Sequence, residues 1–346
     1  MSRYNEQYIF RKANIADVDR LMRFIREHWR ADHILGNDRD FFLYEHGNGK
    51  EVNFVICEDK KTTELVGVHG FIPYSCDPQL RHVCGVMTMV KKDIGVPMLG
   101  VELINQFITL MQYQTYCGIG TNSRTMVPLV KRLFHRSVGQ MQHYYCLNKE
   151  IDDFRIANII SHRKCTVVNS ECDEVELIEF KDFEELKSRY LLNQSYRFLP
   201  YKEDWYIKRR YFEHPIYCYH TWGLCVNGQV IALLIGREII CNQVKILRFV
   251  DYIGDIEALS QIRKEIEKII KINQYEYADF LLHGVPQYIM NQAGFVLKTE
   301  DGNIIPNYFE PFIQSNIEIW FETSHEEMVI FKSDADGDRP SQWLLQ

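Results

Sequence analysis

Several features that would mark a special class of protein are absent from this 346-residue chain. It has no uninterrupted apolar run near the roughly 20 residues that cross a bilayer. Its first residues, Met1-Ser2-Arg3-Tyr4-Asn5-Glu6, do not resemble a secretory signal. We therefore expect a cytoplasmic protein that has no membrane partner.

The ten cysteines form no C-x-x-C pair and have no histidine partner at the spacing of metal ligands. They are scattered singly, for example at Cys57, Cys84, Cys117 and Cys165. This distribution predicts reduced thiols in the core and no metal site.

An excess of positive charge is also missing, since 40 Lys and Arg face 47 Asp and Glu, giving a formal net charge of -7. Proteins that follow the phosphates of nucleic acids need clustered Lys and Arg, so this balance argues against a nucleic-acid partner. Hydrophobic residues make up 46% and charged residues 25%, which is typical of globular proteins. With about 150 residues per domain as a guide, the length predicts two domains.

The most informative segment is residues 82–114. An apolar, strand-like run breaks into Lys91-Lys92-Asp93-Ile94-Gly95-Val96-Pro97-Met98-Leu99-Gly100 and restarts as a helix. A basic, glycine-containing turn that opens a helix exposes backbone N–H groups at the positive end of the helix dipole. Glycine lets the backbone approach a ligand closely. The segment therefore predicts a phosphate-binding loop.

The sequence Lys92-Asp93-Ile94-Gly95-Val96-Pro97 resembles the Q/R-x-x-G-x-G/A coenzyme A loop of the GNAT acyltransferase superfamily. Gly95 matches, whereas Lys92 replaces Gln or Arg, and Pro97 replaces the last small residue. The elements around the loop follow an order similar to that of the family over roughly residues 8–150. Strand-like runs at 53–58 and 65–74 precede the loop, and runs at 116–120 and 141–147 follow its helix.

The resemblance implies that acyl-coenzyme A is a co-substrate and that its pantetheine arm pairs with the strand edge at about residues 87–90. The next strand should then splay away, and Gly118 and Gly120 are suited to that. Asn122 matches a polar residue that reaches the pantetheine, although Asn is equally suited to cap a helix. The expected cofactor contacts are Met87, Met89, Val90, Lys92, Gly95, Val96, Met98, Leu99, Gly100 and Asn122.

The second half of the chain repeats this order of elements. A strand at 215–226 turns at Asn227-Gly228 and returns as 229–238, and a strand at 244–250 leads through a loop into a helix. The offset of about 160–170 residues predicts a tandem duplication with domains at 1–150 and 151–346. The expected fold class is α/β (α+β), in which each half is a mixed, mostly antiparallel twisted sheet flanked by helices.

The two strand–helix junctions differ in charge. The first carries Lys91 and Lys92 with one Asp93, whereas the second carries Asp251 and Asp255 and no base. Two carboxylates at a helix N-terminus satisfy its N–H groups and repel an anion. We therefore expect coenzyme A in the first domain only.

The tandem arrangement resembles three groups: enzymes that N-acylate nucleotide-linked amino sugars, Fem-type peptidyltransferases and mycothiol synthase-like enzymes. The tail at residues 329–340 resembles the ending of the first group, which is found with bacterial O-antigen, lipopolysaccharide and capsule genes. That resemblance implies a dTDP- or UDP-linked deoxyamino sugar as the acceptor. Guanidinium groups suit its diphosphate and aromatic rings suit its base. The candidate substrate contacts are Trp205, Tyr206, Arg237, Arg248, Tyr308 and Arg339.

Acyl transfer to an amine needs a neutral amine and a polarised carbonyl, and benefits from an acid for the leaving thiolate. The helix expected at 124–136 lacks the tyrosine that many family members use as this acid. His69, Asp251 and His283 are candidate bases. Each has an alternative role, as a core histidine, a helix cap and a loop residue, respectively. Direct attack by the neutral amine without a strict base also remains open.

Two alternative functions remain. A Fem-like aminoacyl or peptidyl transferase would use aminoacyl-tRNA, but the basic helical arm usual in that class is lacking. A non-catalytic acyl-coenzyme A-binding protein would explain the missing tyrosine. Either a monomer or a homodimer is compatible with the sequence.

Overall fold

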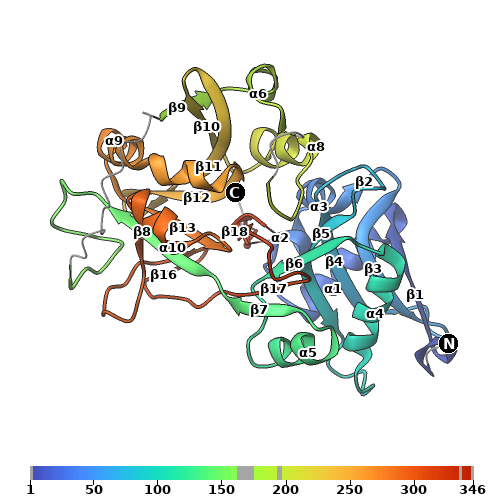
Figure 1. Cartoon of the computed structure of the whole chain (residues 1–346). Coiled ribbons are helices and arrows are strands. Elements are labelled where there is room, and N and C mark those ends of the chain that lie inside the picture. The colour runs from blue at the N-terminus through green and yellow to red at the C-terminus, as the bar shows by residue number, and fades with distance from the viewer. Residues whose placement is uncertain (1–2, 162–174, 193–196, 335–336, 344–346) are drawn as a thin grey trace.

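The computed structural model describes residues 3–161, 175–192, 197–334 and 337–343, and it places them in two mixed β-sheets that lie side by side (Figure 1). Helices flank both sheets, and antiparallel pairing dominates in each. The predicted fold class is therefore confirmed. Cys165, Ala335 and Asp336 lie outside the described residues.

The first sheet has the strand order β1-β3-β4-β5-β6-β17-β7, and β2 pairs with β3. Only β5 and β6 are parallel among these pairs. The strands are β1 (Tyr8–Asn14), β2 (Gly47–Asn48), β3 (Glu51–Asp59), β4 (Leu65–Pro73), β5 (His82–Val90), β6 (Thr115–Ile119), β7 (Ser137–Gln140) and β17 (Trp320–Thr323).

Helices cover the two faces of this sheet. An apolar stripe on the first long helix, including Leu21 and Ile25 one turn apart, packs with strand residues such as Phe54. Phe107, in the helix that follows the predicted phosphate-binding loop, packs on the other face. The helical elements are η1 (Arg3–Glu6), η2 (Ile15–Asp17), α1 (Val18–His28), α2 (Ile34–Asn37), α3 (Arg39–His46), α4 (Leu99–Met111) and α5 (Met126–Leu133).

The second sheet has the order β14-β8-β13-β12-β11-β10-β9, and β18 pairs with β13. Its one parallel pair among the described strands is β12 with β13. The strands are β8 (Gln142–Leu147), β9 (Glu176–Phe180), β10 (His220–Val226), β11 (Gln229–Cys241), β12 (Val244–Gly254), β13 (Tyr275–His283), β14 (Val296–Leu297) and β18 (Ile330–Phe331). A separate hairpin consists of β15 (Tyr308–Phe309) and β16 (Phe312–Ile313).

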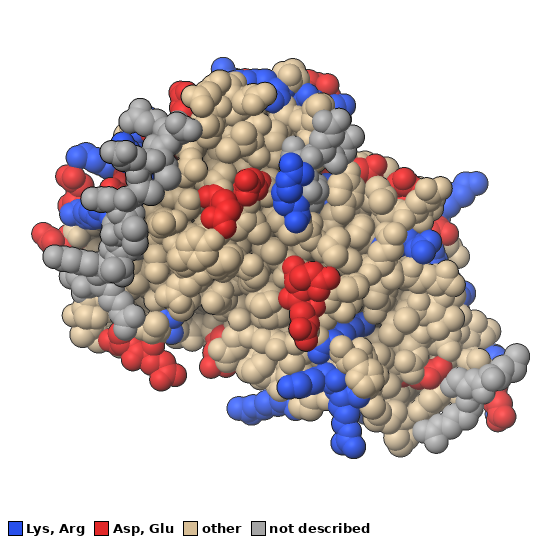
Figure 2. All heavy atoms as spheres, in the orientation of Figure 1, with Lys and Arg blue, Asp and Glu red and all other residues tan. Residues whose placement is uncertain are grey.

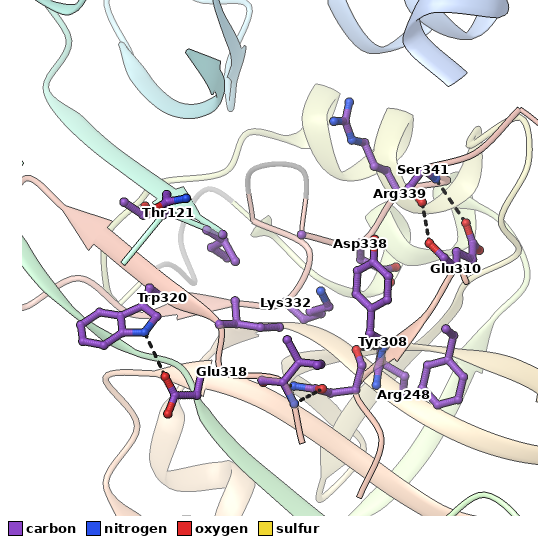
Figure 3. Close-up of a pocket in the computed structure, with 18 of the residues that line it drawn as sticks. Thr121, Arg248, Tyr308, Glu310, Glu318, Trp320, Lys332, Asp338, Arg339 and Ser341 are labelled. Atoms are coloured by element: carbon purple, nitrogen blue, oxygen red, sulfur yellow. Dashed lines mark hydrogen bonds between the residues drawn. The ribbon is translucent and has the colours of Figure 1, made fainter. Parts of the chain in front are cut away.

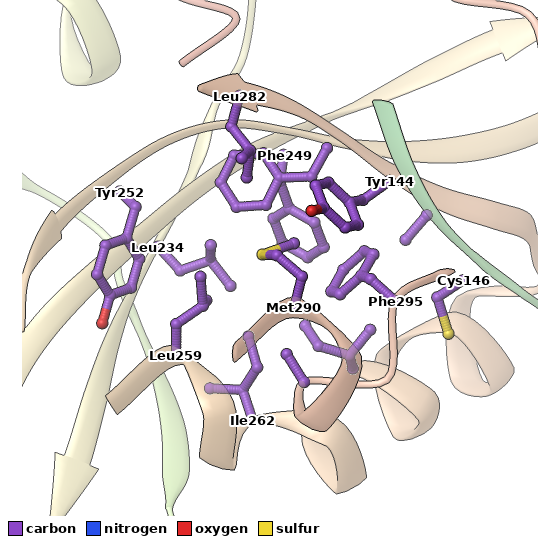
Figure 4. Packing of buried hydrophobic residues seen from close by; sticks show 14 of the residues in the cluster. Tyr144, Cys146, Leu234, Phe249, Tyr252, Leu259, Ile262, Leu282, Met290 and Phe295 are labelled. Carbon is purple, nitrogen blue, oxygen red and sulfur yellow. The ribbon is translucent and has the colours of Figure 1, made fainter. Parts of the chain in front are cut away.

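The predicted hairpin turn at Asn227-Gly228 is confirmed, because both residues have positive φ, +50° and +81°, and they join β10 to β11. The helical elements of this half pack their apolar residues on the sheet, as Leu259 and Met290 show in Figure 4. These elements are α6 (Phe183–Arg189), α8 (Asp204–Ile207), the π-helical turn η3 (Lys208–Phe212), η4 (Ile256–Gln261), α9 (Arg263–Asn273) and α10 (Gln287–Gln292).

The two halves exchange strands. β8 follows β7 after a single residue but lies in the second sheet, between β14 and β13. β17, near the C-terminus, lies in the first sheet, between β6 and β7. The sheets are therefore not divided at residue 150, and the division into 1–150 and 151–346 stays a prediction. Each half therefore supplies a strand to the sheet of the other half.

Within the described segments, every helix is too short or too polar to traverse a bilayer. On the face drawn in Figure 2, basic and acidic side chains occur in small separate groups among uncharged ones.

Candidate functional site

The parallel strands β5 and β6 part in the middle of the first sheet. Their pairing runs from His82 opposite Thr115 to Gly85 opposite Gly118, and then ends. At that point the Tyr116 hydroxyl lies over Gly85, where an added Cβ would come within 2.0 Å of it. Beyond Gly85, β5 continues to Val90 and leads directly into the predicted phosphate-binding loop.

The loop presents backbone N–H groups at the start of α4. Gly95 and Met98 have φ of +64° and +61°, and no side chain caps the helix. Successive turns of this kind aim N–H groups at one point, which suits an anion. The Tyr4 hydroxyl donates to the Pro97 carbonyl at 2.9 Å and so anchors the loop.

A cavity of about 540 Å³ lies between this loop, the start of α4 and α5. Lys91 at its edge is 3.0 Å from Glu64, whereas Lys92 is exposed. The structure brings together here eight of the predicted cofactor contacts: Met89, Val90, Lys92, Gly95, Val96, Met98, Leu99 and Gly100.

Two predicted cofactor contacts lie elsewhere. The Met87 side chain is buried in the core under α1 and α3. The Asn122 side-chain oxygen accepts the backbone N–H groups of Arg124 and Thr125, both at 3.0 Å, just before α5. Asn122 thus holds the turn that leads into α5, whose N-cap residue is Thr125.

The corresponding junction of the second sheet is closed. Pairing of β12 with β13 ends at Phe249 opposite Phe280, and the C-terminal segment enters the gap. Phe331 pairs with Leu282 of β13, and the Ser333 N–H donates to the Val250 carbonyl of β12 at 2.9 Å. Asp255 caps η4 by accepting the Glu257 N–H at 3.0 Å. Protein therefore fills the space that remains open between β5 and β6.

A second cavity, of about 470 Å³, lies between the two halves (Figure 3). The first half supplies Trp29, Arg30, His33 and the end of β6, and the second half supplies parts of β11, β12 and β15. The C-terminal segment supplies Lys332, Gly337 to Arg339 and Ser341. Residues 119–123 line this cavity, and Met126, Leu129 and Phe134 line the cavity of the loop, so one chain segment adjoins both.

Two arginines on neighbouring strands form one wall. Arg237 and Arg248 face each other across β11 and β12, and both are buried. Arg237 stacks on Tyr217, with its guanidinium carbon 3.9 Å from the ring centre, and donates three hydrogen bonds of 2.9–3.1 Å to Asp338. Arg248 donates to Asp279 at 3.0 and 2.6 Å.

These arginines hold their partners ionised. Burial alone would raise the pKa of Asp338, but the charge and hydrogen bonds of Arg237 outweigh burial and lower it. Burial likewise opposes ionisation of Asp279, yet Arg248 lowers its pKa. Lys332 lines the cavity beside these two arginines.

The other substrate candidates divide into two groups. Tyr308 and Arg339 line the cavity between the halves, although in Figure 3 the Arg339 guanidinium points away from Asp338 and Arg248. Its charge acts on His33 and His46 of the first half, whose pKa values burial already lowers. Trp205 and Tyr206 instead line a pocket of about 30 Å³, which has room for about one water molecule and not for a nucleobase.

The three candidate bases are not brought together. His69 is buried, its Nδ1 lies 2.8 Å from the Thr88 hydroxyl, and burial with the charge of Arg136 lowers its pKa to about 3. Asp251 has no exposed surface, so it cannot accept a proton directly from a bound amine.

His283 is half-buried against Phe321 and lines a different cavity. Phe321 and Trp320 are consecutive on β17 and point to opposite faces, so this strand separates His283 from the cavity between the halves. The structure thus supports no direct contact of these three side chains with an acceptor in that cavity.

Sequence reasoning missed several residues of the cavity between the halves. Trp29, His33, Glu318, Trp320, Lys332 and Asp338 all line it. They come from three distant parts of the chain, and only the basic and acidic residues of the C-terminal tail gave any signal in the sequence.

No family model matches the chain, and no curated protein sequence matches it. Among solved structures, a GCN5-related N-acetyltransferase from Anabaena variabilis is similar with a TM-score of 0.52 at 8% identity, over 91% of this chain and 72% of that one. The glucosamine N-acetyltransferase region of a fungal multi-domain β-N-acetylglucosaminidase is similar with a TM-score of 0.50 at 10% identity, over 91% of this chain and 38% of that one. The chain therefore has the fold of GCN5-related N-acetyltransferases.

Proposed function

We propose that this protein is an N-acyltransferase that moves an acyl group from acyl-coenzyme A to the amine of a dTDP- or UDP-linked deoxyamino sugar. The observation that carries the proposal is the pair of cavities that both border the segment of residues 119–134. One has an uncapped helix N-terminus with Gly95 and Met98 at positive φ, and the other is lined by Arg237, Arg248 and Lys332. A transferase needs one site for each of its two substrates, placed so that the reacting groups come together.

The residues of the loop fit coenzyme A. Its pyrophosphate suits the N–H groups at the start of α4, with Lys92 beside them. The amides of its pantetheine arm suit the edge of β5 beyond Gly85, where pairing with β6 has ended. Only the first junction offers this arrangement among the described residues, since the C-terminal segment fills the second.

The second cavity fits an anionic acceptor. Arg237, Arg248 and Lys332 supply positive charge on one wall, and Tyr308 supplies an aromatic ring beside them. Each arginine is already oriented by a carboxylate, so its remaining N–H groups are held in place before a diphosphate arrives.

The proposal is tested by free-thiol release from acetyl-, propionyl- and longer acyl-coenzyme A donors, each with dTDP- and UDP-linked amino sugars. We expect turnover with at least one pair and none with the corresponding hydroxy sugar nucleotide. Turnover with simple amines alone would refute the nucleotide-sugar acceptor. Tight binding of acyl-coenzyme A without consumption by any amine would instead support the non-catalytic alternative.

A further inference from the structure

The cavity between the halves offers few side chains that can take a proton from an amine. Among the described residues that line it, the carboxylates and imidazoles are Glu310, Glu318, Asp338 and His33. An attacking amine must lose a proton before or during acyl transfer, and a base that accepts it must have an available lone pair.

Three of these four groups already accept hydrogen bonds from neighbouring residues at the atoms that would take the proton. Asp338 is buried and accepts three hydrogen bonds from Arg237. Glu310 accepts the Tyr217 hydroxyl on one oxygen and the Ser341 N–H, at 3.2 Å, on the other.

His33 uses its Nδ1 lone pair to accept the Leu35 N–H at 3.2 Å. Burial, together with the charges of Arg339 and Arg30, lowers the pKa of His33 to about 2, so the ring is neutral and its hydrogen sits on Nε2. The His33 ring therefore has no lone pair available to accept a proton.

Glu318 is the remaining group. It is exposed at the cavity, and its Oε2 accepts the Trp320 indole N–H at 3.3 Å, the one hydrogen bond to this carboxylate among the described residues. Its position follows from the backbone, because the Trp320 carbonyl accepts the N–H groups of Gly120 and Thr121 at 2.8 and 3.1 Å.

This places Trp320, whose indole N–H donates to Glu318, beside the end of β6, the strand that parts from β5. In Figure 3, Glu318, Trp320 and Thr121 gather at one end of the cavity. Arg248, Tyr308 and Asp338 lie toward the other end. The cavity thus has an anionic end near the opening between β5 and β6 and a cationic end farther from it.

We propose that Glu318 binds the acceptor amine and takes its proton, a proposal that rests on the proposed function. The amine nitrogen attacks the thioester carbonyl carbon, a C–N bond forms, and the C–S bond breaks. Before the attack, one proton of the ammonium group passes to the Glu318 carboxylate, which leaves the nitrogen neutral. As the C–S bond breaks, the electron pair leaves with the sulfur, and the second proton of the nitrogen reaches the sulfur through solvent. The acceptor therefore carries a cation at one end and an anion at the other.

The test compares wild type with Glu318→Gln and with Glu327→Gln, an exposed carboxylate after β17 that lies outside the cavity. With the best donor and acceptor pair, Glu318→Gln should lower kcat/KM by about 10²-fold near pH 7, within the usual range for a general base. Below the pKa of the acceptor amine, the kcat/KM of Glu318→Gln should rise about tenfold per pH unit, because this variant depends on the fraction of the amine that is already neutral. Glu327→Gln should match wild type.

A binding measurement separates this role from a structural one. Calorimetry with an amino sugar nucleotide and its hydroxy analogue should show that wild type prefers the amine, and that Glu318→Gln loses the preference while retaining affinity for acyl-coenzyme A. If wild type turns over and Glu318→Gln equals it in rate, pH profile and preference, Glu318 has no such role and the proposed function stands. If wild type releases no thiol with any amine, the proposed function fails and this assignment fails with it.

Discussion

Lys202 lies in a buried cluster of charges between the two halves, and its replacement should be among the most damaging in the chain. Its Nζ is 2.6 Å from Asp251 and 2.9 Å from Asp334, and none of the three side chains has exposed surface. The Tyr74 hydroxyl of the first half donates to Asp334 at 2.8 Å, and the Tyr211 hydroxyl donates to Asp251. One cation thus balances two carboxylates that come from a central strand and from the C-terminal segment.

The magnitude follows from the charges that Lys202→Met would leave behind. Methionine keeps most of the aliphatic stem but removes the ammonium, and breaking a buried ion pair from one side costs about 3–5 kcal/mol. Asp251 can escape by protonation, but protonating a carboxyl of ordinary pKa 3.8 at pH 7 costs about 4 kcal/mol. Both routes give a similar loss, which is a large part of the roughly 5–15 kcal/mol that holds a typical protein folded.

The loss should depend on pH in a defined direction. Burial raises the pKa of Asp251 even in the presence of Lys202, with Asp334 adding to the rise. Without the ammonium, the pKa of Asp251 should rise further, so above about pH 4 the folded state binds more protons than the unfolded state and stability falls as pH rises. Lys202→Met should therefore be closer to wild type at pH 5 than at pH 7.

Equilibrium urea unfolding at both pH values measures this effect. The control is Lys208→Met, whose exposed pairing with Glu213 should contribute about 1 kcal/mol or less. The double variant Lys202→Met/Asp251→Asn should recover part of the loss, because only one buried carboxylate remains. A loss below about 1 kcal/mol, or one that is the same at both pH values, would show that the cluster does not hold ionised carboxylates as argued here.

Three further predictions concern the two cavities. In calorimetry, wild type should bind one equivalent of coenzyme A, and Gly95→Glu should weaken this binding by orders of magnitude. The control Gly49→Glu should bind coenzyme A normally, because Gly49 has a similar positive φ and open space at an added Cβ but lies outside the loop. Because Arg237 lowers the pKa of Asp338 in the folded state, the Arg237–Asp338 ion pair should stabilise the fold above pH 4 and lose this effect as pH falls. The free energy of unfolding of Arg237→Met, measured in urea, should lack this dependence on acid. If Arg339 holds the diphosphate, Arg339→Ala should raise the KM for the sugar nucleotide about ten- to hundredfold and leave the KM for acyl-coenzyme A unchanged. An unchanged KM for the sugar nucleotide would assign Arg339 to packing between the halves.

Features encoded in a short stretch of chain were predictable. The loop after β5 depends on its own glycine, its lysines and the helix that follows, and eight of ten expected cofactor contacts line its cavity. The β10–β11 turn needs only Asn227 and Gly228 at positive φ. In such cases local sequence and final structure agree because no distant partner is required.

Features that depend on distant pairing were not predictable. β17 is only four residues long and pairs with β6 about 200 residues earlier, while β8 crosses to the other sheet within one residue of β7. The cavity between the halves is a product of that exchange. The sequence around Glu318 and Trp29 therefore has no local pattern that marks them as lining this cavity. His69 is a candidate base from its residue type and its strand, but in the structure Phe107 of α4 packs over its ring.

The filled gap in the second sheet explains how a duplicated fold acquires two different sites. Where β5 and β6 part, the opening stays available to a ligand, but where β12 and β13 part, Phe331 and Ser333 occupy the space. The same segment includes Lys332 and continues to Asp338, which both line the cavity between the halves, and Lys202 forms an ion pair with its Asp334. Closing the second opening therefore also supplies part of the wall of that cavity. Under the proposed function, this asymmetry leaves one opening for coenzyme A and gives the acceptor a separate site.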